Sequence, residues 1–153
     1  MANKRCCFAG HSSFYDVTIA ARLKETITKL IEEEQVYEFW VGNYGKFDSY
    51  AVSALQECKQ LYPQIKLELI IPYLTKDIEL YKEYYYKKYD HILISEIPNN
   101  TPAKFKIIKN NEYMVRACDY LICYVKHTYG GAYKTLTYAK RKSKTVINLA
   151  PFD

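Results

Sequence analysis

The chain contains 153 residues, of which 49% are hydrophobic and 25% are charged, and its net charge is +5. This length fits one domain, residues 1–153, which buries roughly two thirds of the surface of its unfolded chain. The apolar content excludes an intrinsically disordered protein, and no apolar run approaches the roughly 20 residues of a membrane-spanning helix.

Apolar periodicity predicts alternating strands and helices in the first half of the chain. In the first predicted helix, Leu23 and Ile27 fall on one side, whereas Lys24 and Glu25 fall on the other. Proline after Tyr62 ends the second predicted helix, because the residue before a proline avoids the helical conformation. The predicted strands are 4–9, 36–41 and 66–71, and the predicted helices are 16–34, 48–61 and 76–88.

The same alternation continues in the second half of the chain. The predicted strands are 91–95, 119–125 and 145–149, and the predicted helices are 103–116 and 132–142. Strands rich in Val, Ile and Leu that are separated by helices are typical of a parallel sheet covered on both faces. We therefore predict an α/β fold of three layers, with a mostly parallel sheet of about six strands between two layers of helices.

Glycines follow three of the predicted strands, and ligands of such sheets bind at the carboxyl ends of the strands. The sequence around Gly130 and Gly131 lies between a predicted strand and a predicted helix. This order builds a backbone cradle for an anion, because amides at a helix N-terminus point toward the ligand. Thr135 lies in the first predicted turn beyond the glycines, where its hydroxyl could reach a phosphate.

The loop after the first strand contains Gly10, His11, Ser12 and Ser13. Its serines offer hydroxyl and amide donors to a phosphate, although they could also serve only the turn. His11 could contact a phosphate or a base, or it could be a structural histidine. We do not interpret His11 as a general base, because no carboxylate or cysteine partner lies nearby in the sequence.

The loop after the second strand contains Gly42, Asn43 and Gly45 and leads to Asp48. The two glycines allow this loop to fold over a ligand. The Asp48 carboxylate could accept hydrogen bonds from ribose hydroxyls, or it could cap the following helix. These two interpretations do not exclude each other.

Cysteines and the N-terminus indicate a cytoplasmic protein. Five cysteines, an odd number without the spacing of metal ligands, favour a reducing compartment. Four of them lie in apolar runs, where a small buried hydrophobic residue is expected: Cys6, Cys7, Cys118 and Cys123. The N-terminus leads directly into a predicted strand, so we expect no signal peptide.

The basic excess favours anionic partners but is too small to identify a nucleic-acid-binding protein. Many basic residues fall late in the chain, where solvated helix faces explain most of them. The 17 tyrosines, three of them consecutive at positions 84–86, could stack on bases or fill subunit interfaces. We therefore expect a homo-oligomer and no membrane partner, and we regard nucleic acid as an unfavoured partner.

These loops, in this order, resemble the SLOG superfamily and, within it, the small YpsA-like proteins. That branch opens with a strand ending near Cys-Cys-Phe-Thr-Gly-His-Arg, matched here by residues 6–12. Its second loop, Gly-Gly-Ala-x-Gly-x-Asp, is matched by residues 42–48, and its Gly-Gly-Thr turn by residues 130–132. Its Arg-Asn-x-x-Met-Val helix is matched by residues 110–115. The third-strand region is also similar, at residues 62–67 and 71–72.

The resemblance implies a Rossmann-like fold whose glycine loops bind nucleotides or nucleotide sugars. Related domains sense nucleotide-derived signals in bacterial and phage conflict systems. This chain departs from the family pattern at four positions, because Ser12 replaces arginine, Asn43 glycine, Asn110 arginine and Ala132 threonine. The loss of two guanidinium groups weakens charged clamping of a phosphate.

Our preferred hypothesis is therefore a non-catalytic binding or sensing module for a nucleotide-type small molecule. We assign no catalytic residue, no metal ligand and no further cofactor. The candidate ligand-binding residues are Gly10, His11, Ser12, Gly42, Asn43, Gly45, Asp48, Asn111, Gly130, Gly131 and Thr135.

Two other functions remain open. The LOG branch of the superfamily hydrolyses nucleoside monophosphates at the N-glycosidic bond with a turn of the form Gly-Gly-x-Gly-Thr-x-x-Glu. Its glutamate position falls here on Thr137, so Asp48 or Glu112 would have to substitute. The second alternative is single-stranded nucleic-acid binding, which the charge and the tyrosines favour.

Overall fold

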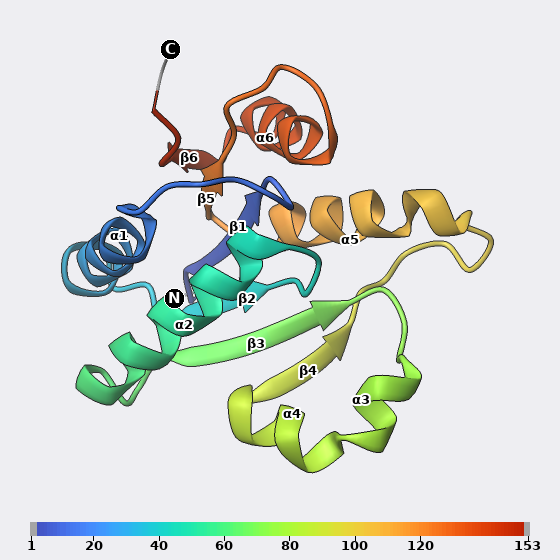
Figure 1. Cartoon of the computed structure of the whole chain (residues 1–153), viewed down its shortest axis with the longest axis horizontal. Coiled ribbons are helices and arrows are strands. Elements are labelled where there is room, and N and C mark those ends of the chain that lie inside the picture. Colours follow the sequence, from blue (N-terminus) through green and yellow to red (C-terminus); the bar gives the residue numbers. More distant parts are fainter. Residues whose placement is uncertain (1–2, 152–153) are drawn as a thin grey trace.

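The computed structural model describes residues 3–151. Six strands within this range form one parallel sheet. The strands are β1 (Arg5–Gly10), β2 (Glu38–Val41), β3 (Lys66–Ile71), β4 (His91–Ile94), β5 (Tyr120–Tyr124) and β6 (Thr145–Asn148). Their order in the sheet is β4-β3-β2-β1-β5-β6, and every neighbouring pair is parallel. The predicted α/β architecture with about six strands is confirmed (Figure 1).

Helices cover both faces of this sheet, as the sequence predicts. They are α1 (Ile19–Glu34), α2 (Lys46–Leu61), α3 (Lys76–Leu80), α4 (Lys82–Lys88), α5 (Ala103–Ala117) and α6 (Gly131–Arg141). Figure 1 shows β6 and α6 at one end of the sheet, and β4 with α3 and α4 at the other. Within residues 3–151, no helix has the length and hydropathy needed to cross a bilayer.

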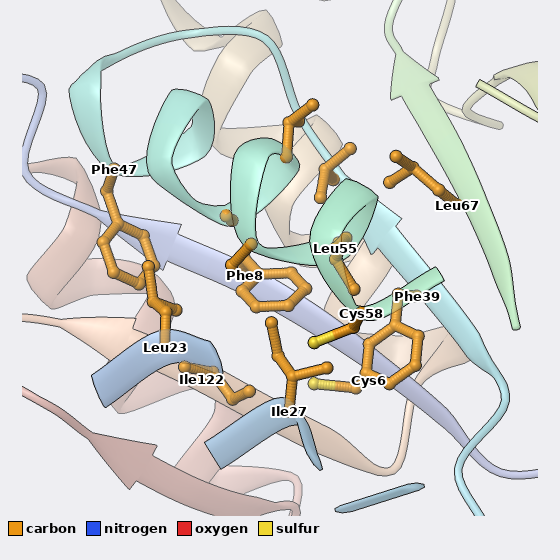
Figure 2. Packing of buried hydrophobic residues seen from close by; sticks show 14 of the residues in the cluster. Cys6, Phe8, Leu23, Ile27, Phe39, Phe47, Leu55, Cys58, Leu67 and Ile122 are labelled. Atoms are coloured by element: carbon orange, nitrogen blue, oxygen red, sulfur yellow. The ribbon is translucent and has the colours of Figure 1, made fainter. Parts of the chain in front are cut away.

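Two separate hydrophobic cores lie on the two faces of the sheet, because successive side chains of a strand point to opposite sides. In β1, Phe8 packs into the core beneath α1 and α2, whereas Cys7 packs into the core beneath α5 and α6. Figure 2 shows the first core, in which Phe8 lies among Ile27 of α1 and Leu55 of α2. All five cysteines are buried free thiols, which agrees with the role predicted for four of them as small hydrophobic residues; Cys58, in α2, is the fifth.

The predicted helix over residues 76–88 is divided into α3 and α4. Tyr81, between them, has a φ of −111° and a ψ of 38°, which lies outside the helical region. Ile78 and Tyr89 on either side of the break are buried in the core beneath α1 and α2. Consecutive tyrosines have modest helix propensity, so packing rather than local preference decides where this helix breaks.

The direction of the chain reverses beside β1, in the centre of the sheet. The chain first builds β1, β2, β3 and β4 toward one edge, and α5 then crosses back so that β5 pairs with the opposite side of β1. The loops after β1 and β5 therefore lead to helices on opposite faces of the sheet. Such a reversal leaves a crevice at the carboxyl ends of the strands.

A tight contact joins the end of β1 to the start of α2. A Cβ atom at Gly10 would lie 2.4 Å from a ring carbon of Phe47. Phe47 is almost fully buried and also packs near Phe8, at 6.5 Å between ring centroids. Gly10 is therefore required for packing, because any side chain there would displace a buried aromatic ring.

We expect Gly10→Ala to lower the free energy of unfolding by about 1 to 3 kcal/mol, because its methyl group overlaps the Phe47 ring. Denaturant unfolding measures this loss. Gly131→Ala is the matched control, since a Cβ atom there meets nothing within 4 Å. Equal stability of the two variants would contradict this account of the contact.

Candidate functional site

A cavity of about 420 Å³ lies where the reversal of the chain predicts a crevice. The loops after β1, β2 and β5 contribute to its lining, and one face of α5 completes it. This volume falls within the roughly 300–1,000 Å³ of typical small-molecule sites. The three glycine loops of the sequence therefore converge on one cavity.

Most of the candidate residues line this cavity, but four of them do not. The lining residues among the candidates are Gly10, His11, Ser12, Asp48, Asn111, Gly130 and Gly131. The candidates outside the lining are Gly42, Asn43, Gly45 and Thr135.

The glycines of the second loop lie outside the cavity lining and make room for groups that line it. A Cβ atom at Gly42 would lie 3.2 Å from Oδ2 of Asp48, and one at Gly45 would lie 2.8 Å from Cα of Ser12. The amide of Lys46 also donates a hydrogen bond to the Ser12 carbonyl at 3.1 Å. Gly45 therefore lets the loops after β1 and β2 approach each other, and Gly42 leaves room for the Asp48 carboxylate. The Asn43 side chain is exposed.

Thr135 is almost fully buried and closes the first turn of α6. Its hydroxyl donates a hydrogen bond to the Gly131 carbonyl at 3.0 Å. The expected reach of this hydroxyl to a phosphate is therefore replaced by a bond within the helix, because threonine in a helix can bond the carbonyl four residues earlier.

Asp48 lies in the first turn of α2, where Gly45 is the N-cap residue. Its Oδ2 atom accepts a hydrogen bond from the Tyr44 amide at 3.0 Å, and within residues 3–151 its Oδ1 atom has no such partner. Burial raises the pKa of Asp48 from 3.8 to about 6, although the Tyr44 amide opposes this rise. Asp48 thus offers one unused carboxylate oxygen to the cavity.

His11 connects the loops after β1 and β5. Its Nε2 atom accepts a hydrogen bond from the Lys126 amide at 2.8 Å, so the neutral ring carries its proton on Nδ1. Burial lowers the pKa of His11, and the charges of His127 and Lys126 lower it further. His11 is therefore a neutral residue that holds two loops together and also lines the cavity.

One wall of the cavity carries an aromatic stack that we did not predict from the sequence. The His11 and His127 rings lie 4.7 Å apart, and the His127 and Tyr129 rings stack at 4.9 Å with an angle of 12°. Tyr129 is 68% exposed, so its ring can receive a further flat partner. Its position directly before Gly130 was the available sequence signal.

The N-terminus of α6 opens at the cavity. Gly130, the N-cap residue, has a φ of 90°, which a side chain rarely adopts. Within the described chain, no side chain caps this helix. The first amides of a helix have no partner inside the helix, so they remain available to an anion.

Helix α5 brings Asn111 to the cavity, together with Ile107 and Ile108. The neighbouring Asn110 is fully buried, and its Nδ2 atom donates a hydrogen bond to the Ile70 carbonyl of β3 at 3.0 Å. This bond holds α5 across the sheet. Asn110, which replaces an arginine of the family pattern, therefore fixes the helix that presents Asn111.

Comparisons with known proteins agree with this fold. A model described as the YspA SLOG family, YpsA, matches residues 8–150. Among curated proteins, no match was found.

Two solved structures share the fold. DNA processing protein A (DprA) from Streptococcus pneumoniae has a TM-score of 0.67 and 19% identity, over 94% of this chain and 49% of that chain. DNA processing protein A from Helicobacter pylori, described for its single-stranded DNA binding mode, has a TM-score of 0.63 and 12% identity, over 94% and 63%. The chain thus spans about half to two thirds of the length of these proteins, and at such identities the likeness shows the fold.

The pKa of Asp48 predicts how stability depends on pH. Its native pKa of about 6 exceeds the ordinary 3.8, so the folded state binds the proton more tightly and loses stability as pH rises through this interval. Because the residue is half-buried, we expect Asp48→Asn to gain about 1 kcal/mol at pH 7.5 and nothing near pH 4.

Denaturant unfolding at both pH values measures this difference. The control is Asp77→Asn on the exposed surface of α3, for which we expect no comparable gain. A gain for Asp48→Asn that is equal at both pH values would contradict the raised pKa.

Proposed function

The chain belongs to the YpsA SLOG family, and from this premise we propose that it binds a nucleotide or nucleotide-derived small molecule in the cavity without transforming it. One observation carries the proposal: the loops after β1, β2 and β5 surround a single cavity at which an uncapped helix begins. This combination suits a ligand that joins a phosphate to a polar ring system.

The phosphate binds to backbone amides in this proposal. The cavity lining includes the start of α6 and the Gly10 to Ser13 turn, and among residues 3–151 no lysine or arginine contributes to it. Amides and the dipole of α6 therefore supply the positive potential. Ser12 and Ser13 are exposed at the rim and can add hydroxyl donors.

The sugar and the base take the remaining walls. The free Oδ1 atom of Asp48 accepts a hydrogen bond from a ribose hydroxyl, as the acidic residue of dinucleotide-binding loops does. Tyr129 continues the stack that begins with His11 and His127, so a base fits against its exposed face.

The cavity offers no free glutamate at the position that the LOG-type hydrolases use for N-glycosidic cleavage, because Thr137 stands there. Asp48 is the one carboxylate in the described lining of the cavity, and it is tied to the Tyr44 amide. Glu112 lies instead between α5 and α6, 3.6 Å from the Lys109 ammonium. We therefore favour binding over hydrolysis.

Incubation of the protein with nucleoside monophosphates or NAD should release no free base. Release of free base in stoichiometric excess over the protein would establish the hydrolase.

We expect the 5′-mononucleotide that gives the largest thermal shift to bind about tenfold more tightly than its 2′,3′-dideoxy analogue, because Asp48 bonds the ribose hydroxyls. Asp48→Asn should reduce this difference to about twofold. Isothermal titration calorimetry measures all four affinities, with Asp77→Asn as the control. Equal reductions for both variants would contradict the role of Asp48, and no binding of any mononucleotide would contradict the proposal itself.

Single-stranded nucleic acid is a second candidate, favoured by the charge of one helical layer. Residues 103–144, which include α5 and α6, hold ten lysines and arginines against two acidic residues, a net charge of +8. The Helicobacter pylori structure of the same fold is described by a single-stranded DNA binding mode. These two observations speak against our expectation that nucleic acid is an unfavoured partner.

A salt titration separates the two candidates. A nucleotide held by amides should lose less than about tenfold in affinity between 50 and 200 mM salt, whereas a single strand contacting about five lysines and arginines should lose about a hundredfold. Fluorescence anisotropy with a labelled oligonucleotide provides the measurement. The binding module predicts no tight, salt-sensitive oligonucleotide complex, so finding one would favour the second candidate.

A further inference from the structure

A second hollow, of about 330 Å³, lies between α5 and α6. Ile108 of α5 lines both this groove and the cavity, so the two spaces are neighbours. Helices α5 and α6 pack against each other on the same face of the sheet. The α5–α6 groove therefore lies next to the proposed nucleotide site, in the layer of α5 and α6.

One face of α6 forms the basic side of this groove. Lys134, Thr137, Tyr138 and Arg141 have spacings of three, four and seven residues, which place them on one side of a helix. Lys134 and Arg141 are exposed, and within residues 3–151 neither forms an ion pair. The Arg141 guanidinium lies 5.5 Å from the centroid of the Tyr138 ring, which supports it beside the groove.

The α5 side of the groove carries one acidic side chain, whose negative charge is paired with a lysine. Glu112 of α5 is half-buried, and its Oε1 atom lies 3.6 Å from Nζ of Lys109. The Arg116 guanidinium also reaches the groove region, where it donates a hydrogen bond to the Tyr138 hydroxyl at 3.2 Å. The groove thus retains an excess of positive charge after its own carboxylate is paired.

Charge is divided unequally between the two spaces. The cavity lining contains no lysine or arginine, whereas the groove has two without acidic partners among the described residues. Outside residues 103–144, the rest of the chain has a net charge of −3. A single phosphate on the amides of α6 leaves the groove cations unused, so they suit a second phosphate.

We propose that the α5–α6 groove is an anion subsite, and that the ligand is a linear dinucleotide with one nucleotide in the cavity and its linking phosphate beside Lys134 and Arg141. This inference rests on the proposed function and names the ligand class. Lys134 and Arg141 bind the phosphate, whereas the Thr137 hydroxyl is already used, because it donates a hydrogen bond to the Lys134 carbonyl at 3.0 Å.

Calorimetry with three probes tests the subsite: a 5′-mononucleotide, the linear 5′-phosphorylated dinucleotide, and the same dinucleotide with an uncharged methylphosphonate linkage. We expect the charged dinucleotide to bind at least about tenfold more tightly than the other two probes. The double variant Lys134→Gln/Arg141→Gln should lose this advantage and keep its mononucleotide affinity within about twofold.

The matched control is Lys140→Gln/Lys142→Gln, which removes the same charge from the same region outside the groove lining. The control should keep the advantage of the dinucleotide, and unchanged melting temperatures would show that both variants fold. An equal loss in both double variants would assign the effect to overall charge and overturn the subsite.

The remaining outcomes separate the two proposals. Mononucleotide binding without any gain from the second phosphate overturns the subsite and leaves the proposed function intact. Binding of none of the probes overturns both. Affinity that continues to rise steeply with longer oligonucleotides also overturns the dinucleotide assignment, because the groove would then hold part of a strand.

Discussion

The central position of β1 is the constraint on which the site depends. This strand pairs in parallel with β2 on one side and with β5 on the other, and the helices that follow cover opposite faces of the sheet. The loops after β1 and β5 must therefore diverge, which opens a crevice above the strands. Without this reversal, the glycine loops would have no common cavity.

Close packing between the first two loops gives this crevice a firm wall. Gly10 lies against the Phe47 ring, and Gly45 lies against the backbone of Ser12. A glycine in a strand-end loop is readily interpreted as space for a ligand, but here it is space for another part of the same protein. Gly130 differs, because its positive φ sets the entry to α6 in open surroundings.

Electrostatics divide the surface around the cavity and the α5–α6 groove into two zones with different chemistry. The cavity offers backbone amides, aromatic rings and one carboxylate of raised pKa. The layer of α5 and α6 carries the lysines and arginines. Recognition in the first zone depends on direction and shape, whereas attraction in the second depends on charge and salt. A ligand that contacts both zones would gain selectivity from one and affinity from the other.

Local signals in the sequence determined the alternation of strands and helices, the three glycine loops and four of the five buried cysteines, but not the break between α3 and α4. Periodicity and glycine positions are properties of short segments, so they can be read without knowing which segments meet. Contacts between distant segments were decided only by the tertiary structure. The crossing of α5 brings Asn111 to the cavity, and the hydrogen bond from the Lys126 amide fixes the His11 ring. Gly10 packs against Phe47, and Gly45 packs against Ser12. These outcomes depend on which strands become neighbours of β1, and no single segment contains that information.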